Sequence, residues 1–151
     1  MDLEYKEIYW LDELSKEYND IVGKKCANLG ELVGLGLRVP YGFALSVKAY
    51  ERFMEETGLK ERVAQIVEKE TKAGLDVEKE IDKMIEMSAR IRGEIELADM
   101  PQGLGREIAE HYDGLQKKVG ISDVACAVRS SGAVSMPGQM ETYLNVRGEA
   151  E

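Results

Sequence analysis

Apolar and polar residues alternate along this chain in two patterns, one typical of short strands and the other of amphipathic helices. Runs of β-branched and aromatic residues predict four strands, near residues 7–11, 43–45, 124–129 and 142–146. Between the second and third runs, apolar residues recur at helical spacing over residues 47–119. The pattern therefore predicts an α+β fold, in which one small mixed sheet packs beside helices.

Two shorter segments complete this pattern. Residues 12–19 are polar and predict a loop. Residues 27–35 carry apolar positions at helical spacing and predict a helix, so that residues 23–25, of sequence Gly-Lys-Lys, lie in a tight turn at its N-terminus. Ser46 directly precedes the long helical region, and its side chain is one that favours the N-cap position.

Composition and charge narrow the class of protein. The chain has 151 residues, of which 44% are hydrophobic and 32% charged, as expected for one globular domain spanning residues 1–151. Its net charge of −9 argues against a general nucleic-acid or membrane surface. Residues 1–7 are acidic and no apolar signal segment follows them, so we expect a cytoplasmic protein. Cys26 and Cys126 lack metal-ligand spacing and predict reduced thiols.

The segment between the last two predicted strands carries the main candidate chemistry. It begins at Arg129, continues through Ser131 and Gly132, and reaches a Met-Pro-Gly turn that ends at Gly138. Backbone N–H groups in such a loop can converge on an anion, and a guanidinium can hold a phosphate by two parallel hydrogen bonds. The alternative is a plain β-hairpin that binds no ligand.

Lys25 is the second candidate, because it lies in the predicted turn at a helix N-terminus. Unpaired N–H groups and the helix dipole favour an anion at such a place, and a lysine there can bind phosphate. The alternative is a solvated surface lysine. His111, the single histidine, lies beside an apolar helical stripe without a neighbouring nucleophile or metal ligand, which predicts a boundary residue and no metal site.

Three segments together resemble a known family. They are IVGKKCANLGELVGLGLRVPYGFALSVKAYERFMEETGL, MPQGLGREIAEHYDGL and VACAVRSSGAVSMPGQMETYLNV, in that order. They are similar to the N-terminal nucleotide-binding domain of the pyruvate, phosphate dikinase and phosphoenolpyruvate synthase family, over nearly the whole chain. This family combines an ATP-grasp-type nucleotide domain, a phosphohistidine domain and a barrel domain that binds phosphoenolpyruvate or pyruvate.

The resemblance implies a role for each candidate residue. The family's phosphate-binding lysine falls on Lys25. Its phosphate-binding arginine falls on Arg129, to which we assign the catalytic role of neutralising the polyphosphate. The family's glycine-bearing loop, which closes over the nucleotide, falls on Ser131, Gly132 and Gly138. The expected ligand is ATP, accompanied by Mg²⁺.

Two departures from the family pattern are visible in the motifs. Lys24 stands where the family has a second glycine, and a side chain there is strained if the backbone φ is positive. The Ser-Met-Pro-Gly turn favours the dikinase branch, in which ATP phosphorylates a histidine on another domain on the way to phosphoenolpyruvate. Phosphoenolpyruvate synthase and rifampicin phosphotransferase are the alternatives within the family.

The family's site is a clamp between two halves, and the resemblance covers only the first half. The acidic Mg²⁺ ligands, the adenine pocket and the phosphohistidine belong to other parts, so we expect this chain alone to be inactive. Its expected partners are a nucleotide and the remaining domains, or a separate chain that carries them; truncation, split subunit and gene remnant stay open. An alternative of another class is a non-catalytic module whose helical face, residues 77–91, docks on a partner chain.

Overall fold

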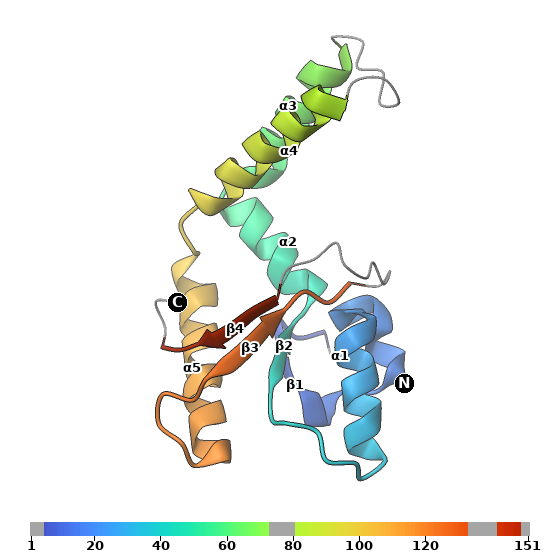
Figure 1. Cartoon of the computed structure of the whole chain (residues 1–151), viewed down its shortest axis with the longest axis vertical. Helices are drawn as coiled ribbons and strands as arrows, with labels where there is room; N and C mark the ends of the chain where they lie inside the picture. The colour runs from blue at the N-terminus through green and yellow to red at the C-terminus, as the bar shows by residue number, and fades with distance from the viewer. Residues whose placement is uncertain (1–4, 73–80, 133–141, 149–151) are drawn as a thin grey trace. The chain divides into compact units, whose positions relative to one another are not determined.

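The computed structural model describes residues 5–72, 81–132 and 142–148 of the chain (Figure 1). It contains helices and two small sheets, so the predicted α+β class is confirmed. Contacts between residues divide the chain into two compact units, residues 1–50 with 103–151 and residues 51–102. The prediction of one domain over residues 1–151 stays a prediction.

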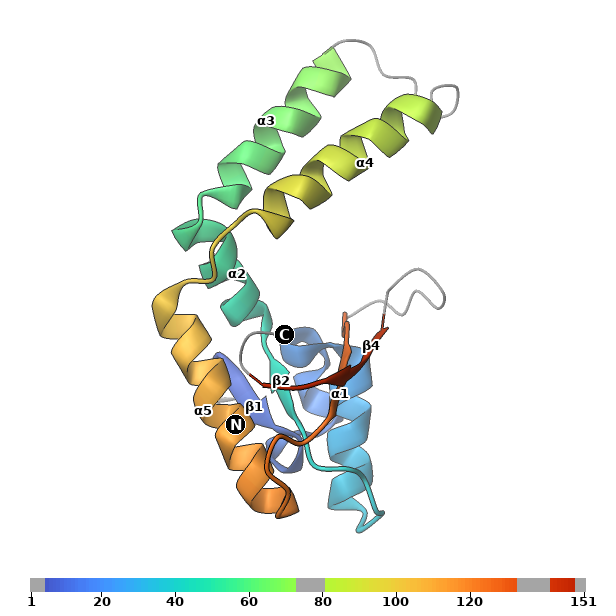
Figure 2. The same ribbon diagram turned by 60° about the vertical axis from the view of Figure 1, so that its left-hand side comes forward.

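The first unit is built around a short antiparallel pair of strands, β1 (Ile8–Trp10) and β2 (Phe43–Leu45). Figures 1 and 2 show this pair between two helices, α1 (Asn19–Gly34) and α5 (Gln102–Val119). Successive side chains of a strand point to opposite faces, so each helix covers a different set of strand residues. Both faces of this pair are therefore covered.

The face toward α1 forms the core of the unit. Tyr9 is 1% exposed and Ala44, its partner across the ladder, is 5% exposed. Gly30 of α1 lies so close to Leu14 that an added Cβ atom would be 2.4 Å from the Leu14 Cβ atom. The buried residues of this core are Tyr9, Leu11, Leu14, Ile21, Val22, Ala27 and Ala44.

The opposite face packs aromatic rings against α5. Trp10 and Phe43 are partners in the ladder, with ring centroids 5.8 Å apart. The His111 ring lies 5.3 Å from the Trp10 ring and 5.5 Å from the Phe43 ring. The Lys118 ammonium lies 4.2 Å from the centre of the Trp10 ring, a favourable cation–π arrangement. His111 is thus a half-buried packing residue, as predicted.

The structure differs from the prediction for residues 12–19. Two 3-10 helices, η1 (Leu11–Glu13) and η2 (Lys16–Tyr18), replace the predicted loop. Local side chains explain this: the Glu13 carboxylate accepts a hydrogen bond from the Trp10 N–H (2.7 Å), and Ser15 Oγ accepts one from the Glu17 N–H (3.4 Å). Helix α1 also begins earlier than predicted, at Asn19.

Ser46 is the N-cap that the sequence predicts. Its Oγ atom accepts a hydrogen bond from the Ala49 N–H (3.3 Å) at the start of α2 (Val47–Glu56). The same hydroxyl donates to the Lys6 carbonyl oxygen (2.8 Å) in the segment before β1. One buried side chain therefore joins the start of a helix to the segment preceding the first strand.

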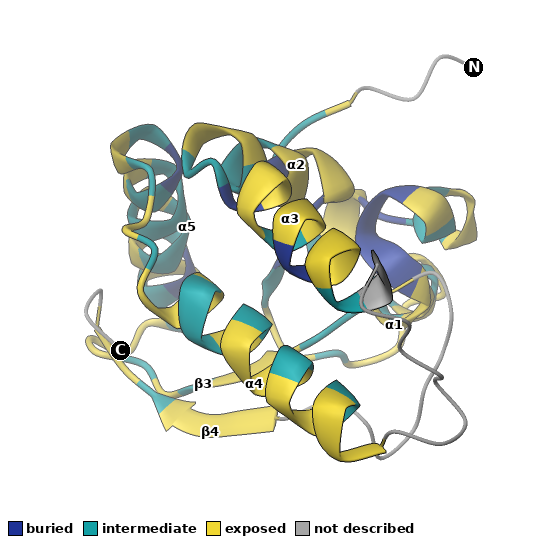
Figure 3. Ribbon diagram, turned by 90° about the horizontal axis from the view of Figure 1, so that it is seen from above, coloured by how far each residue is buried: buried dark blue, intermediate teal, exposed yellow. Residues whose placement is uncertain are grey.

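A second antiparallel sheet consists of β3 (Cys126–Arg129) and β4 (Thr142–Val146). These strands pair only with each other among the described residues, so the single mixed sheet predicted from the sequence is wrong. Figure 3 shows β4 exposed along most of its length, and Tyr143 and Leu144 are 58% and 66% exposed. Polar contacts at both ends of this sheet fix it to α5 and to α1.

The second unit contains most of α2 and a helical hairpin, α3 (Leu59–Lys72) and α4 (Ile81–Glu96). The hairpin is antiparallel, because Arg62 near the start of α3 pairs with Glu94 near the end of α4 (3.0 Å). The helices predicted within residues 47–119 are confirmed as α2, α3, α4 and α5, and residues 57–58 and 97–101 between them are not helical.

Candidate functional site

The segment that follows β3 contacts the start of α1, more than 100 residues earlier in the chain. We call this contact, made by residues 23–26 and 130–132, the junction. Three hydrogen bonds join its two sides: the Lys24 N–H donates to the Gly132 carbonyl oxygen (3.0 Å), the Cys26 N–H to Ser131 Oγ (3.2 Å), and Lys25 Nζ to the Ser130 carbonyl oxygen (2.7 Å).

Gly23 explains how two backbone segments come so close. Its φ and ψ of 79° and 158° interrupt the helical backbone of α1, a conformation that glycine adopts without strain. A Cβ atom at this position would be 2.5 Å from the Ser131 carbonyl carbon and 2.6 Å from the Gly132 nitrogen. The positive φ falls on Gly23 and not on Lys24, so the lysine in the family's second glycine position adopts an ordinary conformation.

In the junction, the Lys25 side chain contacts Ser130, the residue that follows Arg129 in the sequence. Both side chains are exposed, and the Arg129 guanidinium makes no hydrogen bond or ion pair with another described residue. The Lys25 ammonium has three N–H donors, one of which is directed at Ser130. Two cationic side chains from opposite ends of the sequence therefore retain donors for an anionic ligand, in a protein whose net charge is −9.

The other predicted site residues have different outcomes. Ser131 and Gly132 lie in the junction, where they accept hydrogen bonds from the N–H groups at the restart of α1 after Gly23. The sequence predicts unpaired N–H groups at this helix start; for Lys24 and Cys26 that prediction is wrong, because the loop occupies both groups. Gly138 lies outside the described residues.

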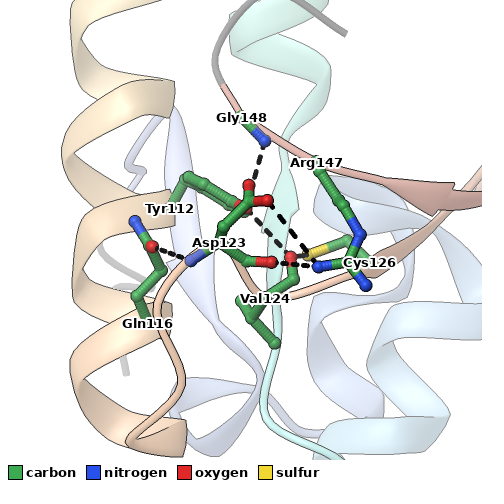
Figure 4. Close-up of polar contacts among 7 residues, drawn as sticks. All are labelled: Tyr112, Gln116, Asp123, Val124, Cys126, Arg147 and Gly148. Carbon is green, nitrogen blue, oxygen red and sulfur yellow. Dashed lines mark hydrogen bonds and ion pairs between the residues drawn. The ribbon is translucent and has the colours of Figure 1, made fainter.

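A second polar cluster fixes the opposite end of the β3–β4 sheet to α5 (Figure 4). The Tyr112 hydroxyl of α5 donates to the Val124 carbonyl oxygen (2.9 Å) and accepts from the Gly148 N–H (3.1 Å). It thereby contacts the chain both before β3 and after β4. The sequence contains no local signal for this cluster, because its members are up to 36 residues apart.

Asp123 organises the rest of that cluster. Its φ of 52° turns the chain before β3, and its N–H donates to the Gln116 side-chain oxygen on α5. The Arg147 guanidinium donates to the Asp123 carbonyl oxygen and lies 3.7 Å from its carboxylate (Figure 4). Beside them, burial raises the pKa of the Cys126 thiol, so this cysteine is less readily ionised than a free thiol.

Among the described residues, no cluster of three or more histidine, cysteine, aspartate or glutamate side chains has the arrangement of a metal site. None of the helices described combines the length and the apolar character that crossing a membrane requires.

Comparison with known proteins gives a consistent picture. Residues 19–151 match the family model described as the pyruvate phosphate dikinase AMP/ATP-binding domain. The chain is 42% identical over 149 residues to a probable phosphoenolpyruvate synthase of Methanocaldococcus jannaschii, an alignment that covers 95% of this chain. It is 40% identical to the phosphoenolpyruvate synthase of Aeropyrum pernix, in an alignment that covers 99% of this chain. It is 32% identical to the phosphoenolpyruvate synthase of Aquifex aeolicus, in an alignment that covers 93% of this chain.

These relatives are much longer than the chain. The alignments cover 12% of the Methanocaldococcus protein, 18% of the Aeropyrum protein and 17% of the Aquifex protein. The shared part is therefore one region of a larger protein in each relative. Since the family model matches from the first residue of α1 onward, this chain belongs to the pyruvate phosphate dikinase AMP/ATP-binding domain family.

Proposed function

We propose that this chain forms part of the ATP-binding site of a phosphotransferase of the phosphoenolpyruvate synthase type, and that Lys25 and Arg129 bind the polyphosphate. One observation carries the assignment: Lys25 Nζ lies 2.7 Å from the carbonyl oxygen of Ser130, the residue that follows Arg129. Two cationic side chains carried by backbone segments in contact suit a polyphosphate, because phosphoryl transfer depends mainly on positioning and charge neutralisation.

The chemistry of the junction suits phosphate better than a metal ion. Lys25 in the junction offers an ammonium and Arg129 beside it a guanidinium, and both cations form charge-assisted hydrogen bonds to phosphate oxygens. Mg²⁺ requires oxygen ligands with negative or partial negative charge, which neither cation can supply, and Ser131 Oγ already accepts a hydrogen bond from the Cys26 N–H. The residues of the junction therefore do not fit the Mg²⁺ that the family resemblance implies, and we assign them to the phosphates alone.

The choice of branch follows the relatives. The Ser-Met-Pro-Gly turn favours a dikinase, whereas the relatives described above carry the name phosphoenolpyruvate synthase. We therefore favour the synthase branch, in which the phosphoryl group of ATP passes to a histidine and then to pyruvate. The acceptor histidine belongs to another domain in this proposal, because His111 packs between aromatic rings and its Nδ1 atom lies 2.7 Å from the Glu107 carbonyl oxygen.

The test is a calorimetric titration of the chain with Mg·ATP. We expect Lys25→Ala and Arg129→Ala each to weaken binding by roughly 10- to 100-fold, as for the loss of a hydrogen bond between charged groups. Lys117→Ala and Arg38→Ala remove exposed cations elsewhere and are the matched controls, expected to bind as the parent does. If the parent fails to bind Mg·ATP, or if both site variants bind as tightly as the parent, the proposal is wrong.

One observation favours a second candidate function, a module that docks on a partner. Ile81 and Ile85, one turn apart on α4, are 65% and 60% exposed. They belong to the helical face of residues 77–91 predicted to dock, of which residues 77–80 lie outside the described part. Sedimentation of the purified chain tests this candidate: a monomer whose sedimentation Ile85→Glu leaves unchanged contradicts self-association through this face.

A further inference from the structure

In the junction, oxygen atoms of the loop after β3 accept hydrogen bonds from backbone N–H groups of α1. At the restart of α1, backbone N–H groups would ordinarily lack partners within the helix and could bind an anion. Here Ser131 Oγ and the Gly132 carbonyl oxygen accept hydrogen bonds from two of these groups, so the loop acts as the N-cap of a helix 105 residues earlier. A phosphate at this place would have to displace the cap.

The side chains of the junction are arranged differently from its backbone. Lys25 uses one of its three ammonium donors on the Ser130 carbonyl oxygen, and the Arg129 guanidinium has no partner among the described residues. A ligand would therefore be bound by cationic side chains, among them Lys25 and Arg129, and not by the Lys24 and Cys26 amides. What holds the backbone segments that carry them together is the cap formed by Ser131 and the close approach allowed by Gly23.

Gly23 and Ser131 act on each other directly. A Cβ atom on Gly23 would be 2.6 Å from Ser131 Oγ and closer still to the Ser131 carbonyl carbon. The side-chain oxygen could rotate away, but the backbone atoms could not move without taking the loop with them. Any side chain at position 23 must therefore push residues 130–132 away from α1.

We propose that Gly23 and Ser131 are positioning residues, which cap α1 with the loop after β3 and so hold Lys25 and Arg129 on the same polyphosphate. In this inference Ser131 Oγ serves the Cys26 N–H and not the nucleotide. The inference rests on the proposed function, because it assumes that Lys25 and Arg129 bind the ligand. The new element is that the joint binding of the ligand by Lys25 and Arg129 depends on Gly23 and Ser131, which do not contact the ligand.

A double-mutant cycle measures that cooperation. Mg·ATP affinity is determined for the parent, Lys25→Ala, Arg129→Ala and the double variant, and the four proteins are then made again with Ser131→Ala. With Ser131 present, we expect the two charge removals to be non-additive by about fivefold or more, as is usual for side chains that share a partner. With Ser131→Ala, we expect them to become additive and the affinity to fall roughly tenfold.

Conservative variants separate positioning from general stability. Ser131→Thr keeps the hydroxyl and should restore most of the affinity, whereas Ser122→Ala, which removes an exposed hydroxyl before β3, should change nothing. Amide exchange measured by NMR gives a readout without nucleotide: the Cys26 N–H should lose protection in Ser131→Ala and keep it in Ser131→Thr. Gly23→Ala should lose both affinity and Cys26 protection, and if it does not fold, the Ser131 variants decide alone.

Failure of this inference can be distinguished from failure of the proposed function. If Lys25→Ala and Arg129→Ala weaken binding but Ser131→Ala binds as the parent does, with the coupling intact, the positioning role is wrong and the proposed site stands. If the Cys26 N–H is equally protected in the parent and in Ser131→Ala, the cap itself is wrong. If neither charge removal weakens binding, the proposed function fails and this inference fails with it.

Discussion

The two small sheets of the first unit are held in opposite ways. The β1–β2 pair lies between α1 and α5 and is fixed by apolar contacts on both faces, with Tyr9 almost completely buried. The β3–β4 pair exposes most of its side chains and is fixed by hydrogen bonds at its two ends. One sheet is therefore stabilised by burial along its length, and the other by polar contacts at its ends.

This difference matches what each sheet carries. The buried pair contains no candidate ligand residue, whereas β3 ends at Arg129 and leads directly into the junction. Burial favours a rigid scaffold, because packed cores tolerate little change in shape. Polar contacts at two points can fix the position of a strand end while leaving its side chains accessible to a ligand. The buried pair thus serves as structural support, and the proposed ligand residue Arg129 lies at the end of the exposed pair.

The largest expected effect lies in the α1 core beside the buried sheet. Gly30→Ala places a Cβ atom 2.4 Å from the Leu14 Cβ atom and 2.5 Å from the Leu14 carbonyl oxygen, a clash that only backbone movement relieves. We expect the free energy of unfolding to fall by about 3 kcal/mol, the upper part of the usual range for overpacking. Urea unfolding followed by the fluorescence of Trp10, the single tryptophan, measures it.

Gly34→Ala is the matched control in the same helix. No atom lies within 4 Å of the Cβ atom it would add, so the change should be neutral or stabilise the protein by up to about 1 kcal/mol through helix propensity. If Gly30→Ala and Gly34→Ala have the same stability, the close packing of α1 against Leu14 does not stabilise this core.

The next effect tests the polar end of the exposed sheet. Tyr112→Phe removes the hydroxyl that joins the Val124 carbonyl oxygen and the Gly148 N–H, while the ring keeps its place on α5. We expect a loss of about 1–2 kcal/mol in the free energy of unfolding, typical of buried or half-buried hydrogen bonds. The Gly148 amide should also exchange faster with solvent, as NMR would show.

The same variant should leave the buried sheet alone. The emission spectrum of Trp10 before unfolding should match the parent, because no bond of Tyr112 reaches β1 or β2 among those described. Tyr41→Phe removes a hydroxyl from a 62% exposed side chain and is the control. If Tyr112→Phe shifts the Trp10 spectrum and leaves the exchange rate of the Gly148 amide unchanged, the two sheets are not held separately.

Sequence patterns predicted the elements of both sheets better than their partners. Strands at residues 43–45 and 142–146 match the structure to the residue, because β-branched and aromatic runs bounded by turn residues are a local signal. The pairing into two separate sheets could not be predicted, since the Tyr112 hydroxyl and the residues it binds lie far apart in sequence. Nothing in a local pattern specifies such partners.

The candidate site shows the same division between local and distant information. The family resemblance selected Lys25 and Arg129, and the structure places Lys25 on the residue after Arg129. A Gly-Lys-Lys turn was visible in the sequence, but the contact of Gly23 with the Ser131 backbone was not, because it depends on how the two ends of the chain meet. Whether these residues bind a nucleotide stays a prediction until the titrations are made.

The smallest expected effect concerns the pH dependence of the buried sheet. Burial raises the pKa of the Tyr9 phenol above its usual value of 10.0, although a hydrogen bond from the Lys6 N–H (2.7 Å) acts in the opposite direction. The folded state therefore binds the phenolic proton more tightly than the unfolded state. The stability this contributes is fully present below about pH 10 and is lost as the pH rises through the folded-state pKa.

Unfolding free energies measured from about pH 8 to about pH 12, a range that spans the usual phenol pKa, test this pH dependence. The parent should lose stability above pH 10 more steeply than Tyr9→Phe, which has no proton to release, and Tyr41→Phe is the exposed control. Since Tyr9 lies in the α1 core and not beside β3 or β4, the loss of stability at alkaline pH should begin in the β1–β2 region. If the parent and Tyr9→Phe have parallel pH profiles, the pKa of the Tyr9 phenol is not raised in the folded protein and this prediction is wrong.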